Sequence, residues 1–372
     1  MNIFRRLPLP RLLLLLCGIV LAVGIGATAI TLAAGTGPKP PPKPLAQAVH
    51  DALSSTPVEG VSARIQLTDH LLEGANLASG GDNTGGAGLL SSPLLTGASG
   101  RMWIAKDGRV RLELQAEKGD TQILYDGQTV SIYDASSNTL YRYTMPAKKG
   151  DTSTTPAATS PDHHEVPTVA NIEEAISHLE HVNVSEAKPD DVAGQAAYTV
   201  RVSPKESGSL IGAGELSFDA VHGVPLRAAI YSSNSLSSPT IELATTEISY
   251  GPVDNSVFDI SPPSGAKIED LNTSTSKPDS SGHSADQGNK PKLTSHGNGI
   301  STIGVLESKT QSSGTPGNST LEGLQKVKID GVEANELPTA LGTLLSFERS
   351  GVHYLLLGAV SPSSVETVAK GL

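Results

Sequence analysis

The chain has 372 residues and a formal net charge of −11, with 38 acidic against 27 basic side chains. This acidity argues against nucleic-acid binding, because neutralising phosphates needs clustered lysine and arginine. The single cysteine, Cys17, lies in an apolar N-terminal run, so the rest of the chain offers no disulfide, thiolate metal site or cysteine nucleophile.

The N-terminal segment has the pattern of an export signal or a membrane anchor. Arg5, Arg6 and Arg11 precede an uncharged run over 12–34, which as a helix is long enough to span a bilayer core of about 30 Å. Arginines on this side predict that the body lies outside the cytoplasm. Residues 1–35 are therefore either a removed signal peptide, which gives a secreted protein, or a transmembrane anchor, which gives a single-pass membrane protein. A Pro-rich spacer follows over 36–44.

A short helix is expected over 45–53 and a strand over 61–67, where apolar residues alternate with polar ones. The Gly- and Ser-rich stretch that follows, 74–99, is long for a loop in a compact domain. It carries four leucines, which we interpret as a lid over a cavity, a membrane-touching loop or a satellite core: Leu89, Leu90, Leu94 and Leu95.

Residues 100–143 predict a train of short antiparallel strands. Val110, Leu112 and Leu114 alternate with polar residues, as in a strand with one solvated face. Asp107-Gly108 and Asp126-Gly127 are favoured two-residue hairpin sequences. We therefore expect one continuous sheet whose apolar face must be covered by another element.

An amphipathic helix is predicted over 169–182, with Ile172, Ile176 and Leu179 on one face. We expect this face to be buried against the sheet. On the opposite face, we expect His178 and His181 to be solvated.

Further strands are predicted over 197–202, 214–219, 224–231 and 240–250. The polar composition of residues 271–299 then predicts a disordered linker. A small C-terminal α+β unit is expected over 300–372, with a strand at 301–306, a hairpin of 344–349 with 352–358, and a helix starting at Ser361-Pro362.

Two segments carry a family resemblance: ILYDGQTVSIYDASSNTLYRY at Ile123–Tyr143 and SVFDISPPSGAKI at Ser256–Ile268. With the order of elements around them, they resemble the bacterial LolA-like, outer-membrane lipoprotein-sorting family and the related N-terminal domain of the RseB/MucB proteins. The resemblance covers 45–270. It is strongest to the long Gram-positive type, which has an extra C-terminal domain.

The resemblance implies a mainly β (α+β) fold, in which an open antiparallel half-barrel is plugged by helices and its concave apolar face can hold acyl chains. It implies a non-enzymatic, extracytoplasmic carrier of lipids or of lipoprotein acyl chains, with no cofactor and no metal. The alternative is a cell-envelope sensor acting on a membrane partner such as an anti-sigma factor.

Candidate ligand-cavity residues follow from the shared face of the strands, from the amphipathic helix and from the single tryptophan, which either packs in the core or lines the cavity. They are Trp103, Val110, Leu112, Leu114, Ile123, Ile132, Ile176 and Leu179.

Overall fold

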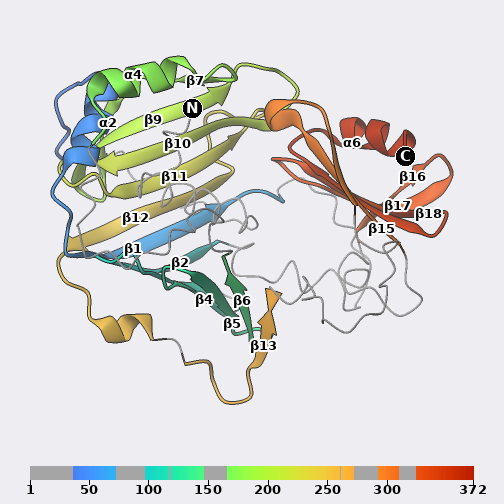
Figure 1. Cartoon of the computed structure of the whole chain (residues 1–372), viewed down its shortest axis with the longest axis horizontal. Coiled ribbons are helices and arrows are strands. Elements are labelled where there is room, and N and C mark those ends of the chain that lie inside the picture. The colour runs from blue at the N-terminus through green and yellow to red at the C-terminus, as the bar shows by residue number, and fades with distance from the viewer. Residues whose placement is uncertain are drawn as a thin grey trace, which may run out of the picture.

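Two sheets and three α-helices make up the described part of the chain, and the strands pair antiparallel except for the parallel pair of β13 and β6 (Figure 1). The computed structural model describes residues 37–72, 97–116, 119–145, 166–259, 261–271, 292–309 and 324–372. Among these residues, no helix is long and apolar enough to cross a membrane. The N-terminal run over 12–34 lies outside the described residues.

The first sheet has thirteen strands in the order β13-β6-β5-β4-β3-β2-β1-β12-β11-β10-β9-β7, with β8 paired to β9. It is open, because β13 and β7 end the order without pairing to each other. This confirms the predicted mainly β class with an open sheet, few helices and a small C-terminal unit. The strands are β1 (Gly60–Asp69), β2 (Ala98–Ala105), β3 (Val110–Ala116), β4 (Gly119–Tyr125), β5 (Thr129–Asp134), β6 (Thr139–Thr144), β7 (Val182–Val184), β8 (Lys188–Val192), β9 (Gln195–Pro204), β10 (Ile211–Asp219), β11 (Pro225–Ser232), β12 (Ile241–Tyr250) and β13 (Lys267–Asp270).

The two faces of this sheet differ in chemistry because side chains alternate along each strand. One face, called here the apolar face, carries a core cluster that includes Val61, Leu67, Leu114 and Leu243. The other, the polar face, carries the intervening residues of the same strands, and the short 3₁₀ helix η2 (Asn255–Phe258) packs on it beside β3.

Helices α2 (Leu45–Ser54) and α4 (Val169–Ser177) pack together on the apolar face at the β9–β10 end of the sheet (Figure 1). Their apolar residues meet Tyr198 of β9 and Phe218 of β10. The side chain of Thr168 caps the start of α4 by accepting a hydrogen bond from the Asn171 backbone N–H.

Helix α4 is shorter than the sequence predicts. We expected it over 169–182, but it ends at Ser177, with His178 as its C-cap, and Val182 begins β7. Strand β7 pairs with β9, so backbone hydrogen bonding to the sheet replaces a further helical turn.

The second sheet has six strands in the order β14-β15-β19-β18-β17-β16, with helix α6 (Pro362–Lys370) packed on one face. Val365 and Ala369 of α6 are fully buried against Val305, Leu345 and Leu356. The strands are β14 (Lys292–His296), β15 (Ile303–Lys309), β16 (Gln325–Ile329), β17 (Val332–Pro338), β18 (Thr343–Arg349) and β19 (Val352–Gly358).

The linker predicted over 271–299 extends too far. Strand β14 lies inside it and pairs with β15, followed by the 3₁₀ helix η4 (Gly299–Ser301). Its sequence, KLTSH, contains one apolar residue, so strand pairing rather than an apolar pattern defines it.

Among the described residues, backbone hydrogen bonds join the two sheets at two places. The turn between β17 and β18 places Leu341 in the core cluster of the first sheet, and the Ala340 N–H donates to the Leu71 carbonyl at 2.8 Å. At the second point, the Leu210 N–H donates to the Ala359 carbonyl at 2.7 Å. The C-terminal unit therefore contributes directly to the apolar core of the first sheet.

Candidate functional site

Five of the candidate cavity residues lie together on the apolar face. In the register of β3, β4 and β5, Leu112 pairs with Ile123, and Ile123 pairs with Ile132. Val110 and Leu114 have the same parity on β3 as Leu112. The alternation of the sequence therefore predicted the shared face of these five residues, and their role in binding a ligand stays a prediction.

The apolar face continues beyond these strands into β2, β1 and β12. Met102 pairs with both Leu112 and Ala63, and Leu67 pairs with Leu243. All these residues are buried, and Leu114 is only 1% exposed. Residues that include Ile65, Met102, Ala228 and Leu243 border a space of about 10 Å³ within the face. The described core residues of the face are therefore shielded from solvent in this structure.

The two helix residues expected in the cavity lie elsewhere. Ile176 packs with the cluster of α2, β9 and β10, apart from the cluster that contains Leu112. Leu179 is 39% exposed, so its predicted burial is wrong. The reason is the end of α4 at Ser177, which takes Leu179 off the apolar stripe of the helix. His178 and His181 are exposed, as predicted.

Trp103 lies on the polar face, so it does not share a face with Leu112 and the other candidate residues of β3 to β5. In the register of β2 and β3, Trp103 pairs with Arg111, whereas its neighbour Met102 pairs with Leu112. Trp103 is half-buried and packs against a cluster that contains Ala105, Leu124 and Phe258. A strand with a period of two separates adjacent residues onto opposite faces, and the sequence of β2 alone did not reveal its parity.

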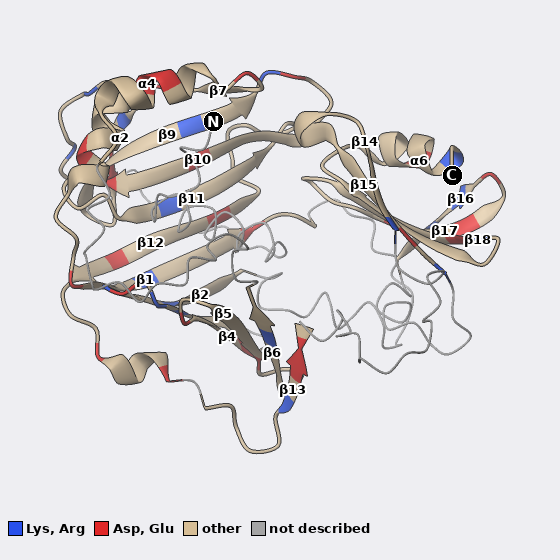
Figure 2. Ribbon diagram, viewed as in Figure 1, with Lys and Arg blue, Asp and Glu red and all other residues tan. Residues whose placement is uncertain are grey.

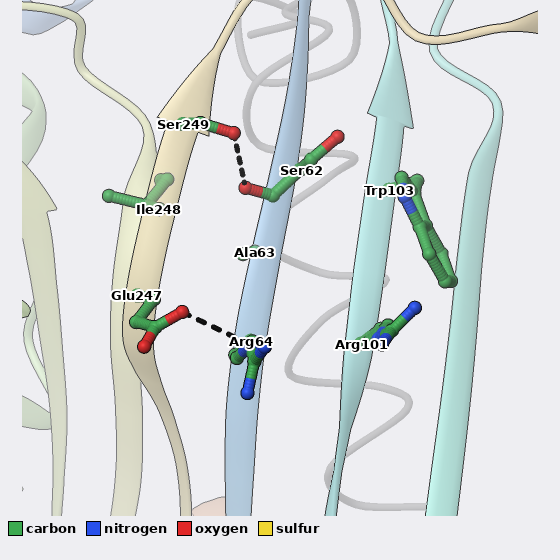
Figure 3. Close-up of a pocket in the computed structure, with 8 residues that line it drawn as sticks. All are labelled: Ser62, Ala63, Arg64, Arg101, Trp103, Glu247, Ile248 and Ser249. Atoms are coloured by element: carbon green, nitrogen blue, oxygen red, sulfur yellow. Dashed lines mark hydrogen bonds and ion pairs between the residues drawn. The ribbon is translucent and has the colours of Figure 1, made fainter.

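Beside Trp103 the polar face contains a hollow of about 300 Å³ (Figure 3). It lies over the centre of the sheet, where β12, β1 and β2 run next to one another. Its lining residues are Ser62, Ala63, Arg64, Arg101, Trp103, Glu247, Ile248 and Ser249. We define these residues as the polar-face hollow.

Six of these side chains form two rows across the three strands on the polar face, whereas Ala63 and Ile248, between the rows, pack in the core cluster of the apolar face. In one row, Ser62 pairs with Ser249 on one side and with Trp103 on the other. In the second row, Arg64 pairs with Glu247 and with Arg101. The Arg64 Nε lies 3.1 Å from the Glu247 Oε2, and both side chains are largely exposed.

A second polar group occupies the same face at the β9–β12 end. The Glu215 carboxylate accepts hydrogen bonds from Arg201 Nη1 at 2.9 Å and Arg227 Nη1 at 2.9 Å. It also accepts one from the Tyr231 hydroxyl at 2.7 Å, and Arg227 in turn donates to Glu242. Charged strand segments of both signs are visible here in Figure 2.

This network lowers the pKa of Glu215. Burial acts to raise the pKa, but hydrogen bonds from Tyr231 and from the two arginines outweigh burial and hold it below the usual value. The carboxylate stays ionised and joins β9, β10 and β11, and Arg227 extends the network to Glu242 of β12. The sequence offered no signal for this network, because it depends on the register of four strands.

The remaining candidates add no chemistry to these sites. The lid leucines, Leu89 to Leu95, lie outside the described residues. Within the described ranges, no three histidine, cysteine or carboxylate side chains gather in a way that could hold a metal ion. Glu174 and His178 approach to 3.9 Å on the exposed surface of α4.

No protein-family model matches the chain, and no curated protein matches it. It is similar to solved structures of low identity. One is the Pseudomonas aeruginosa MucA/MucB complex, at 12% identity and a TM-score of 0.41, covering 87% of this chain and 94% of that chain. Another is MucB in complex with MucA(peri), at 11% identity and a TM-score of 0.40, with the same coverage of both chains. A third is a LolA superfamily protein from Nitrosomonas europaea, at 8% identity and a TM-score of 0.24, covering 58% of this chain and 98% of that chain.

Proposed function

We propose that this protein binds the acyl chains of a lipid or lipoprotein on the apolar face of its large sheet, outside the cytoplasm and without catalysing a reaction. The observation that carries the proposal is the extent of that face. Its core cluster draws on β12, β1, β2, β3 and β4, with Val130 and Ile132 of β5 packed against it. No residue of the described helices belongs to this cluster, because α2 and α4 pack at the β9–β10 end.

The chemistry of the face suits an acyl chain. Its buried side chains are mainly aliphatic, including Ile65, Leu67, Leu112 and Leu114. Each methylene removed from water contributes about 0.8 kcal/mol, and an acyl chain needs no hydrogen-bonding partner. Since these side chains are buried in this structure, an acyl chain would replace the contacts that now shield them from solvent.

The proposed location rests on the N-terminal sequence. Arg5, Arg6 and Arg11 on the N-terminal side of an apolar run favour export of everything that follows. The LolA-like sequence pattern is consistent with an exported lipid-handling protein. For a protein of the long Gram-positive type, we propose that the ligand is a lipid or lipoprotein of the cell surface.

A sensory role is the second candidate, and Leu341 favours it. This residue belongs to the C-terminal unit but is 8% exposed within the core cluster of the first sheet. A ligand that displaces this contact would also change how the C-terminal unit is held. A sensor that acts on a membrane partner, for example an anti-sigma factor, requires such a ligand-dependent change in the C-terminal unit. MucB, in one of the similar structures, is seen bound to a periplasmic part of MucA.

The proposal is tested by a charge placed on either face of one strand. Ile132 of β5 is half-buried on the apolar face, and its neighbour Ser131 has the opposite parity. We expect Ile132→Glu to weaken binding of a fluorescent fatty acid to the full chain by about tenfold or more, because the carboxylate would be desolvated without a partner. Ser131→Glu should bind as the parent does.

Both variants retain the N-terminal apolar run, so probe that partitions into that run contributes equally to both. Circular dichroism should show that Ile132→Glu remains folded. Equal binding by the two folded variants would reject the apolar face as the lipid site. Stoichiometric capture of a membrane regulator, with no lipid bound, would favour the sensory role.

A further inference from the structure

The polar-face hollow has no role in acyl-chain binding, because it lies on the opposite side of the sheet from Leu112 and Leu114. Its volume of about 300 Å³ is at the lower end of the range of about 300–1,000 Å³ for ligand pockets. Three central strands build it, and the pairing of β1 with β12 shifts register directly after Arg64 and Glu247. Neighbouring strands, rather than a loop, therefore set the positions of its side chains.

The charges in the hollow are unbalanced. Arg64 and Arg101 are direct cross-strand partners on the same face, and directly opposed like charges destabilise a sheet. Glu247 pairs with Arg64, but no hydrogen bond or ion pair joins Arg101 to another described residue. Glu113, the other cross-strand partner of Arg101, instead accepts a hydrogen bond from Arg111 Nη2. The hollow thus presents a free guanidinium group beside a partly neutralised one, in a protein of net charge −11.

Trp103 supplies the apolar part of the hollow. Its indole is supported by the cluster of Ala105, Leu124 and Phe258 and also borders the hollow (Figure 3). A half-buried tryptophan fixed in this way offers a flat surface on which a ring can stack. The hydroxyl groups of Ser62 and Ser249 lie in the same row. The Ser249 hydroxyl donates to the Ser62 carbonyl at 3.3 Å and keeps its acceptor capacity for a polar ligand, whereas the Ser62 hydroxyl can donate or accept.

We propose that the polar-face hollow binds a saccharide that carries a carboxylate. The apolar face of one pyranose ring would stack on Trp103, and its carboxylate would lie between the guanidinium groups of Arg64 and Arg101. Ser62, Ser249 and Glu247 would bind ring hydroxyls. Guanidinium groups favour carboxylates because two parallel N–H bonds match the two oxygens.

The combination of groups selects this ligand over others. A lipid chain would leave the charged groups of the hollow unpaired, which is costly. A nucleic acid would meet too few positive charges in this acidic chain. A carboxylated sugar satisfies the excess positive charge, the aromatic surface and the hydroxyl partners together.

The chain contains one tryptophan, so its fluorescence reports on this hollow alone. We would titrate the full chain with trigalacturonate and, separately, with the neutral maltotriose. We expect a saturable change in tryptophan emission with trigalacturonate and binding about tenfold weaker with maltotriose. Raising the salt concentration should weaken only the binding of the acidic sugar, because screening acts on the exposed charges.

Arg101→Gln tests the proposed contact, and Arg142→Gln is its matched control. Arg142 lies on β6, on the same face but outside the hollow, so both variants remove one positive charge. Arg101→Gln should weaken trigalacturonate binding about tenfold while Arg142→Gln leaves it unchanged. Equal effects of the two variants, equal binding of the two sugars, or no response to either sugar would overturn the proposal. None of these results bears on lipid binding to the other face.

Discussion

The two faces of the large sheet differ in how they use the same strands. On the apolar face, Leu112, Ile123 and neighbouring side chains form one continuous cluster with β1 and β12. On the polar face, the charged groups fall into separate sites, with Glu215 and Arg227 fully paired at one end and Arg101 at the centre without an ion-pair partner among the described residues. The comparison shows that a single period-two pattern can build a packing surface and a set of discrete polar sites back to back.

The largest expected difference between the faces is in stability. Leu114 is 1% exposed on β3, whereas the adjacent Gln115 is exposed. Leu114→Ala should lower the free energy of unfolding by about 2–5 kcal/mol because it leaves a cavity. Gln115→Ala should change it by less than about 0.5 kcal/mol. Urea denaturation of both variants measures the difference, and similar losses would contradict the assignment of the two faces.

Replacing Glu215, the paired carboxylate of the polar face, should change the free energy of unfolding by an intermediate amount. Glu215→Gln should cost about 1–3 kcal/mol at pH 7, because hydrogen bonds between charged groups are weakened. Glu247→Gln, in an exposed pair, should cost less than about 1 kcal/mol. Denaturant midpoints of the two variants test this ranking, and a reversed order would show that the Glu215 network is not stabilising.

In acid, the stability of the parent protein should approach that of the Glu215→Gln variant. Because the folded pKa of Glu215 is lowered, its contribution is fully present above its unfolded pKa of about 4.3. This contribution is lost as the pH falls through the folded pKa. We therefore expect the stability difference between the parent and Glu215→Gln to shrink below about pH 4. A difference that persists unchanged into stronger acid would argue against an ionised Glu215.

The pH dependence of stability should have the opposite sign for Glu336, a buried carboxyl group of the second sheet. Glu336 of β17 is 3% exposed on the second sheet, and burial together with the charge of Glu366 raises its pKa. The folded state then retains a proton that the unfolded state has lost, so stability falls as the pH rises from about 4.3 through the raised pKa. Glu336→Gln should raise the melting temperature at pH 7 and have little effect below about pH 4. A lower melting temperature at pH 7 would show that the charge of Glu336 is compensated.

The alternation of polar and apolar residues was sufficient to predict most strands and the inward parity of Val110, Leu112 and Leu114. It could not predict the parity of Trp103, because β2 carries small or polar residues at both parities: Ala98, Ser99, Gly100 and Arg101. Strand β14 was missed because its order comes from pairing with β15. The end of α4 was misplaced because β7 competes for the same residues.

The sequence predicted candidate site residues only where the alternation within a single strand determines the face on which they lie. The five residues of β3 to β5 on the apolar face satisfy this condition. The hollow combines residues from β12, β1 and β2, which are distant in the sequence, and its like-charged pair of Arg64 and Arg101 becomes visible only when the register is known. The same is true of Leu341, which reaches the first sheet from the C-terminal unit.

The central claim, that acyl chains bind on the apolar face, is tested most directly by where a lipid attaches. The full chain would be photolabelled with a fatty acid that carries a diazirine near its methyl end, and the labelled residues would be mapped by mass spectrometry. We predict labels on the apolar-face residues of β1 to β5, such as Leu67, Met102 and Ile132, and their loss in competition with unlabelled fatty acid. Labels confined to the N-terminal run over 12–34 or to the polar face, or labels that unlabelled fatty acid does not remove, would contradict it.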